Sequence, residues 1–130
     1  MTGFVEQFPT DNQAPALARR ALDAGLPEDV LAGVGATLRL LVSELVTNSV
    51  RHAATSGGGE VRLGVTVRRR VIRVEVRDRG AGFERTAPVP KGADGGFGLF
   101  LVEKMASRWG VDRKDGTSVW FELDLEPARR

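Results

Sequence analysis

The sequence predicts an α+β fold: a two-layer α/β sandwich in which helices cover one face of a mixed, mostly antiparallel sheet. Apolar residues recur at helical spacing over residues 14–25 and 26–54, whereas residues 60–67 and 71–78 alternate between apolar and polar. A short turn separates the two alternating segments, which favours antiparallel pairing. The composition, 42% hydrophobic and 28% charged over 130 residues, fits one soluble domain spanning residues 1–130.

The N-terminal half is predicted to hold one strand and two helices. The strand is "FVEQF", residues 4–8, and "PTDNQ" then offers capping residues for a helix over 14–25. The following segment, residues 26–54, is mostly helical, and we expect it to be irregular at Gly33 and Gly35. The glycine-rich "TSGGG" ends it.

The C-terminal half is predicted to hold four strands and one helix. Two alternating strands, residues 60–67 and 71–78, lead into a Gly- and Pro-rich loop over 79–98. Helical periodicity resumes over 99–109, and residues 111–125 finish as a hairpin with "KDGT" at the turn. The inward side of these strands should hold Val61, Leu63, Val65, Ile72, Val74, Val76, Val119, Phe121, Leu123 and Leu125.

The composition excludes several classes of protein. There are no cysteines, which rules out disulfides and thiolate metal sites and fits a reducing cytoplasm. We expect neither a signal peptide nor a run near the ~18 apolar residues of a membrane span. The net charge is +2, and we interpret "RRR" at 68–70 as a solvated hairpin turn without the interleaved aromatic residues of a nucleic-acid site.

One edge of the second helix carries three polar residues four positions apart: Glu44, Asn48 and His52. They flank an apolar stripe formed by Leu41, Val42, Leu45 and Ser49. Taken alone, they can be a solvated flank. They can also be a site, because an amide oxygen suits Mg²⁺ and a carboxylate one turn away can accept a proton.

Three glycine-containing segments add further candidates. In "DRGAG", residues 78–82, Asp78 can accept a hydrogen bond from the exocyclic amine of adenine, although the motif alone also fits a surface turn. In "GGFGLFLV", residues 95–102, glycines open a helix whose N–H groups favour an anion, but no Lys-Ser or Lys-Thr follows as in a P-loop. "GTSVWFEL", with Gly116 and Thr117, is by itself a hairpin turn.

The order of these segments resembles that of the GHKL ATPases, which share the Bergerat ATP-binding fold. "ELVTNSVRHA" resembles the N box of that family, "DRGAG" the G1 box and "GGFGLFLV" the G2 box. "SELVTNSVRHA" and "GLFLVEKMASRWGV" are similar to the bacterial anti-sigma-factor serine kinases of the RsbW and SpoIIAB type. The resemblance covers nearly the whole chain.

The resemblance implies a role for each motif residue. Glu44 would be the general base, Asn48 the Mg²⁺ ligand and Asp78 the contact to the adenine amine. Thr117 would support adenine, often through water, and the G2 glycines would line the triphosphate beneath a mobile lid. For His52 we expect a structural hydrogen bond. The nucleotide-binding residues implied are Asn48, Asp78, Gly80, Gly82, Gly96, Gly98, Leu99 and Thr117.

The resemblance also implies an activity and partners. The expected function is an ATP- and Mg²⁺-dependent serine/threonine kinase that acts as an anti-sigma factor and phosphorylates an anti-anti-sigma partner of the STAS type. The alternative is an ATP-dependent interaction module with little or no kinase activity. A sigma factor and a second copy of the chain are further expected partners, whereas direct nucleic-acid and membrane binding are not expected.

Overall fold

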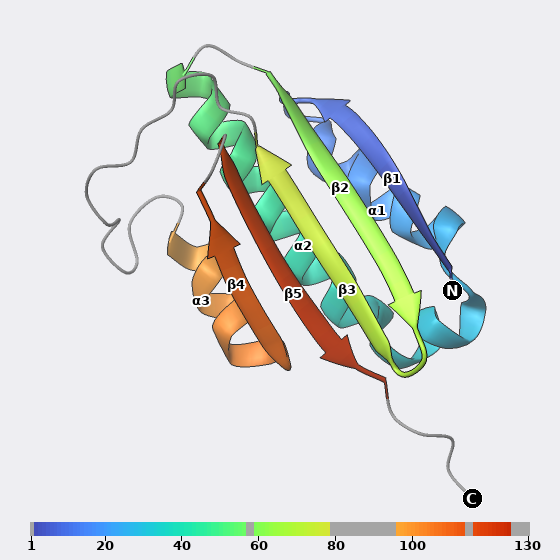
Figure 1. The fold of residues 1–130 in the computed structure, drawn as a ribbon. Coiled ribbons are helices and arrows are strands. Elements are labelled where there is room, and N and C mark those ends of the chain that lie inside the picture. Colours follow the sequence, from blue (N-terminus) through green and yellow to red (C-terminus); the bar gives the residue numbers. More distant parts are fainter. Residues whose placement is uncertain (1, 57–58, 79–95, 114–115, 126–130) are drawn as a thin grey trace, which may run out of the picture.

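The computed structural model describes residues 2–56, 59–78, 96–113 and 116–125 (Figure 1). The elements follow in the order β1 (Thr2–Pro9), α1 (Ala14–Gly25), α2 (Glu28–Ser56), β2 (Glu60–Arg68), β3 (Val71–Asp78), α3 (Gly96–Met105), β4 (Arg108–Asp112) and β5 (Thr117–Asp124). This order of strands and helices confirms the one predicted from the sequence.

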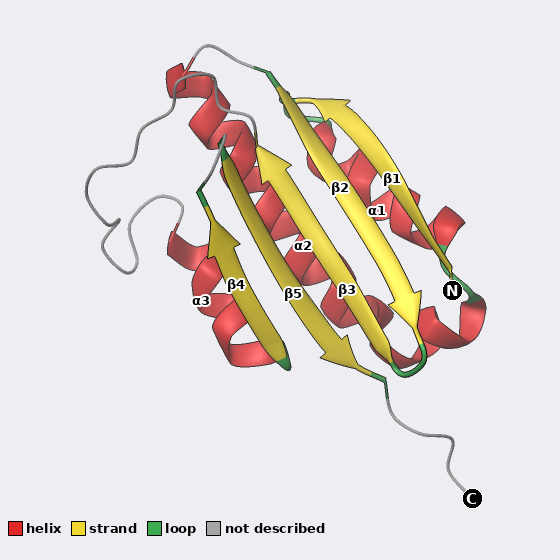
Figure 2. Ribbon diagram, viewed as in Figure 1, coloured by secondary structure: helices red, strands yellow, loops and turns green. Residues whose placement is uncertain are grey.

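The five described strands form one sheet in the order β1-β2-β3-β5-β4. All four neighbouring pairs are antiparallel, so the described sheet contains no parallel pair, and the mixed character expected from the sequence is absent from this part of the chain. The three described helices lie on one face of the sheet and leave the other face open (Figure 2). The fold is therefore the predicted α+β two-layer sandwich.

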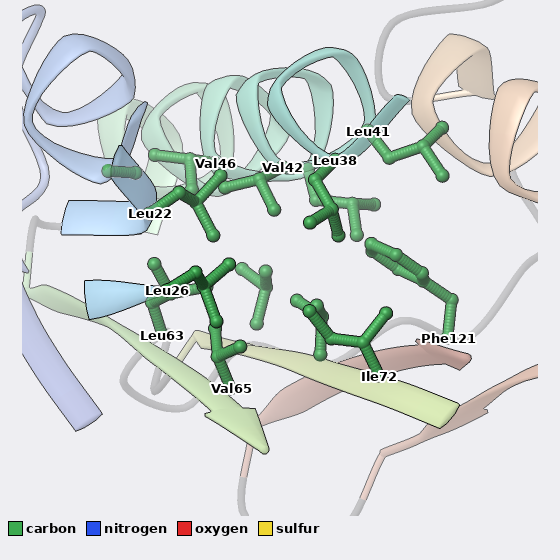
Figure 3. Close-up of a cluster of buried hydrophobic side chains, with 14 of the residues drawn as sticks. Leu22, Leu26, Leu38, Leu41, Val42, Val46, Leu63, Val65, Ile72 and Phe121 are labelled. Atoms are coloured by element: carbon green, nitrogen blue, oxygen red, sulfur yellow. The ribbon is translucent and has the colours of Figure 1, made fainter. Parts of the chain in front are cut away.

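The core lies between the helix layer and the inward side of the strands (Figure 3). Leu38, Leu41 and Val42 of α2 are fully buried over the sheet. Burying one such side chain stabilises a fold by roughly 1.5–3 kcal/mol, so this layer provides much of the driving force for folding. The predicted inward residues of β2 and β3 are all buried: Val61, Leu63, Val65, Ile72, Val74 and Val76.

The second helix is continuous through both glycines, so the expected irregularity at Gly33 and Gly35 is wrong. A glycine inside a helix costs roughly 1 kcal/mol relative to alanine. Here α2 is 29 residues long and packs along the sheet, and tertiary packing of one face outweighs that local cost.

The third helix ends earlier than the apolar spacing predicted. It stops at Met105, and Trp109 lies in β4, where it pairs with Phe121 of β5. The backbone N–H of Ser107 already donates to the carbonyl of Glu122 at 2.8 Å. Cross-strand pairing with β5 therefore overrides the helical spacing of "MASRW".

Within Glu28–Arg51, the helix α2 contains an 18-residue window with a mean hydropathy of 1.6, which by length and composition alone is apolar enough to cross a membrane. The expectation from the sequence concerned an uninterrupted apolar run, and Arg39 and Glu44 interrupt this segment. In the fold, however, the apolar stripe of α2 covers the sheet, and a core helix satisfies the same criterion.

The turn between β2 and β3 carries the three consecutive arginines. Arg68, Arg69 and Arg70 are all exposed, and the backbone of Arg69 has a φ of 54°. The placement and exposure agree with the interpretation of "RRR" as a solvated hairpin turn.

Candidate functional site

The elements that carry the predicted site residues converge at one end of the sandwich (Figure 1). Ser56 ends α2, and β2 begins only four residues later at Glu60. Asp78, the last residue of β3, is paired with Val61 on one side and with Thr117, the first residue of β5, on the other. The end of α2, the end of β3 and the start of β5 therefore lie at the same end, which we call the polar end.

Polar side chains are buried at this end. Within the described residues, the buried polar or charged side chains are Asn48, Ser49, Asp78 and Ser118, exposed by 8%, 5%, 5% and 1%. Two belong to the last third of α2, one ends β3 and one lies near the start of β5. Burying polar groups costs free energy unless they are hydrogen-bonded, and among the described residues no buried side-chain nitrogen or oxygen lacks a hydrogen-bond partner. The collection of these residues makes this end the candidate site.

The apolar stripe predicted beside the polar edge of α2 is buried as expected. Leu41, Val42, Leu45 and Ser49 are buried against the rest of the fold. Asn48 is buried beside this stripe, and Glu44, one helical turn earlier, is half-buried. His52 lies in α2, but its side chain is outside the described part of the structure.

The glycine-rich segments are described only in part. The helix α3 begins at Gly96, so Gly96 and Gly98 lie in its first turn, where N–H groups are left without helical partners. Leu99 is half-buried and packs against the core. Gly80 and Gly82 lie outside the described residues, as do residues 84–95, the segment expected from the sequence to form the mobile lid.

The start of β5 is fixed by features on both sides of Thr117. Gly116 has a φ of 100°, a conformation that L-residues rarely adopt, so the turn into Thr117 depends on glycine. Thr117 is half-buried opposite Asp78. The next residue, Ser118, donates a side-chain hydrogen bond to Glu75 of β3.

Ser118 and Glu75 were not predicted from the sequence. Strand alternation places both on the open face, but the hydrogen bond depends on the pairing of β3 with β5, which are 43 residues apart at this bond. The sequence carries no local signal for that pairing, because α3 and β4 intervene.

Charged groups on the open face form a separate network toward the other end of β5. Arg108 bonds Glu122 at 2.7 Å and also pairs with Asp124, while Arg73 bonds Glu122 at 3.2 Å and lies 4.2 Å from the centre of the Trp120 ring. The hydrogen bond from Arg108 lowers the pKa of Glu122 below its usual range. The hydrogen bonds that Arg108 donates to Asp124 and Glu122 raise the pKa of its guanidinium above the usual value.

Comparison with known proteins identifies this arrangement. The sequence matches the histidine kinase-like ATPase domain over residues 9–123. The chain belongs to the histidine kinase-like ATPase family. This assignment agrees with the resemblance to the GHKL ATPases found in the sequence. It also agrees with the α+β two-layer fold of the chain.

Several relatives bear the name serine-protein kinase RsbW. The protein from Oceanobacillus iheyensis is 30% identical over 95 residues, which covers 63% of this chain and 60% of that protein. Two proteins from Listeria monocytogenes, serotypes 4a and 4b, are each 32% identical over 95 residues with the same coverage. The match thus spans less than two thirds of the length of these relatives.

Proposed function

We propose that this chain binds ATP with Mg²⁺ at the polar end and transfers the γ-phosphate to a serine or threonine of an anti-anti-sigma partner of the STAS type. The observation that carries the proposal is the burial of Asn48 and Asp78 at one end of a histidine kinase-like ATPase fold, with Thr117 in register with Asp78. The name serine-protein kinase carried by its relatives supports the choice of acceptor.

The base of the nucleotide would be recognised by the β3–β5 pair. An ionised Asp78 accepts hydrogen bonds and donates none, so it suits the amine of adenine, whereas guanine has a carbonyl at that position. Thr117 opposite it would support the base. The phosphates would lie along the remaining proposed contacts, Gly80, Gly82, Gly96, Gly98 and Leu99, with the start of α3 offering N–H donors.

The residues at this end fit Mg²⁺ held jointly with phosphate. The described residues contain no group of three or more His, Cys, Asp or Glu side chains able to hold a metal ion. Mg²⁺ usually takes few protein ligands and completes its shell with water and phosphate oxygens. The buried amide of Asn48 would be its protein ligand, and the ion would neutralise charge on the phosphates.

Glu44 would act as the general base. It is half-buried one helical turn from Asn48, on the same edge of α2. In the transfer, the hydroxyl oxygen of the acceptor bonds to the γ-phosphorus, the bond from that phosphorus to the β,γ-bridging oxygen breaks, and ADP leaves. Glu44 accepts the hydroxyl proton.

The proposed setting is the cytoplasm, where the chain acts as an anti-sigma factor by holding a sigma factor. A homodimer is part of the proposal, and direct nucleic-acid or membrane binding is not. The alternative is an ATP-dependent interaction module with little or no kinase activity. It would need the same nucleotide-binding residues as the kinase.

Incubation with labelled ATP and candidate anti-anti-sigma proteins from the same genome tests the proposal. Label on a serine or threonine of one candidate, absent when Mg²⁺ is chelated, is the expected result. ATP binding combined with stable partner capture and no label would replace the kinase proposal by the interaction module.

A further inference from the structure

The hydrogen bond between Ser118 and Glu75 joins β5 to β3, the two strands that carry Thr117 and Asp78. It lies on the open face of the sheet, opposite the face toward which Asp78 and Thr117 point. Ser118 is almost completely buried, at 1% exposure, and its hydroxyl donates to a carboxylate oxygen of Glu75. Strand alternation turns Asp78 and Thr117 toward the helices and turns Ser118 and Glu75 toward the open face. The two faces of the same strand pair thus hold the proposed base contacts and this buried bond.

The bond ties β5 to β3 diagonally. Ser118 is paired with Arg77, and Glu75 lies two residues before Arg77 on the same face of β3. Diagonal neighbours of this kind are within reach of long side chains and stabilise one register of a strand pair. Deleting the serine hydroxyl leaves a half-buried carboxylate without this donor, which is unfavourable for the native register.

Thr117 is therefore held from both sides. On its N-terminal side, Gly116 adopts a φ of 100°, which fixes the turn. On its C-terminal side, Ser118 is fastened to Glu75. The main-chain pairing of β5 with β3 and β4 brings Thr117 opposite Asp78, and these two features on either side of it restrict it further.

We propose that Ser118 and Glu75 are positioning residues that hold Thr117 opposite Asp78 and thereby sharpen the preference for adenine over guanine. The nucleotide part of this inference rests on the proposed ATP binding, whereas the anchoring of Thr117 does not. Neither residue touches the nucleotide, because both face away from it on the open side of the sheet.

Affinity for ATP and GTP in the variants Ser118→Ala, Glu75→Ala and Glu75→Gln tests the selectivity. The two alanine variants should lose about 3- to 10-fold in ATP affinity with GTP affinity unchanged, because a loosened Thr117 weakens the adenine contact. Glu75→Gln keeps an oxygen that can accept from Ser118, so its ATP affinity should stay within about twofold of the parent. An unchanged ratio of ATP to GTP affinity in Ser118→Ala would overturn the proposal.

Glu122→Ala is the matched control. It removes the 3.2 Å bond from Arg73, which also joins β3 to β5 on the open face but four residues further along β5. It also removes the 2.7 Å bond from Arg108 of β4, so it disturbs the sheet at least as much. This variant should keep the parental ratio of ATP to GTP affinity. An equal loss of selectivity in Glu122→Ala would mean that any loosening of the sheet has this effect, and the positioning role would be refuted.

Amide hydrogen exchange in the nucleotide-free protein separates this inference from the proposed function. In Ser118→Ala, exchange should accelerate about fivefold or more at residues 117–119 and little at residues 121–123, because local anchoring is lost. If the parent binds no ATP, the proposed function fails while this local pattern still supports the anchoring. Uniform or unchanged exchange would overturn the anchoring whatever binds.

Discussion

The two ends of the sandwich differ in how deeply their polar side chains are buried. At the polar end, Asn48, Asp78 and Ser118 are buried. Toward the other end, Arg68, Arg69 and Arg70 are exposed in a turn, and Arg108 pairs with acids on the open face. Exposed charges remain solvated and their pairs contribute little, whereas buried polar groups require specific partners. The difference makes the polar end the candidate for specific recognition.

The largest expected effect comes from Glu44→Gln, which tests whether the polar end performs chemistry as well as binding. Glutamine keeps the shape and hydrogen-bonding capacity of the side chain but cannot take a proton from the acceptor. Loss of a general base should lower the rate of phosphotransfer by about 10²–10⁴, with nucleotide affinity nearly unchanged. A kinase assay and calorimetry on the same preparation measure both. Transfer at the parental rate would show that Glu44 is not the base.

The next effect is expected from Asp78→Asn, which sharpens the contrast between a buried and an exposed acid. The substitution replaces one acceptor oxygen with a donor amide opposite the adenine amine, and a buried mismatch costs ~1–3 kcal/mol. ATP affinity should therefore fall roughly five- to hundredfold. Asp124→Asn is the control, because Asp124 is exposed near the other end of β5 and should leave ATP affinity unchanged. Equal affinity of the parent protein for ATP and GTP would show that Asp78 does not recognise the base.

A smaller loss is expected from Asn48→Ala. Removing a direct Mg²⁺ ligand should weaken Mg²⁺-dependent nucleotide binding by roughly tenfold, because water replaces the amide oxygen only in part. Ser49→Ala is the matched control: Ser49 is the next residue along α2 and is also buried, at 5% exposure, but has no proposed metal role. Titration of ATP with and without Mg²⁺ measures the effect. If both variants bind Mg·ATP like the parent, the polar edge of α2 has no part in the site.

The sequence predicted most of the fold because the deciding signals are local. Alternation in β2 and β3 identified the inward residues, and four-residue spacing placed Glu44 and Asn48 on one edge of α2. The signals failed where distant pairing decides the outcome. Trp109 continues a helical pattern but joins β4 because β5 is available to pair with it. The bond of Ser118 to Glu75 likewise exists only because β3 lies beside β5.

The smallest effect is expected at the charged network, where Glu122→Gln tests how little exposed pairs contribute. The hydrogen bond from Arg108 is the main cause that lowers the pKa of Glu122 below its ordinary value of 4.5. A carboxyl whose pKa is lower in the folded state stabilises the fold above its unfolded pKa, and this stabilisation is lost as the pH falls through the folded pKa.

Thermal melts of Glu122→Gln and the parent over a range of pH measure that contribution. At pH 7 the melting temperature of Glu122→Gln should be lower by only about 2–5 °C, since partly exposed pairs contribute little. The difference should begin to shrink as the pH falls below the ordinary carboxyl pKa of 4.5, where the unfolded chain takes up protons, and should vanish once the pH falls through the lowered pKa of Glu122 in the folded parent. Glu103→Gln, at an exposed position of α3 with no ion pair among the described residues, should show no such pH-dependent difference. A large loss at pH 7 that persists in acid would mean that Glu122 acts through packing, and the contrast between the two ends would then be weaker than the burial of their side chains indicates.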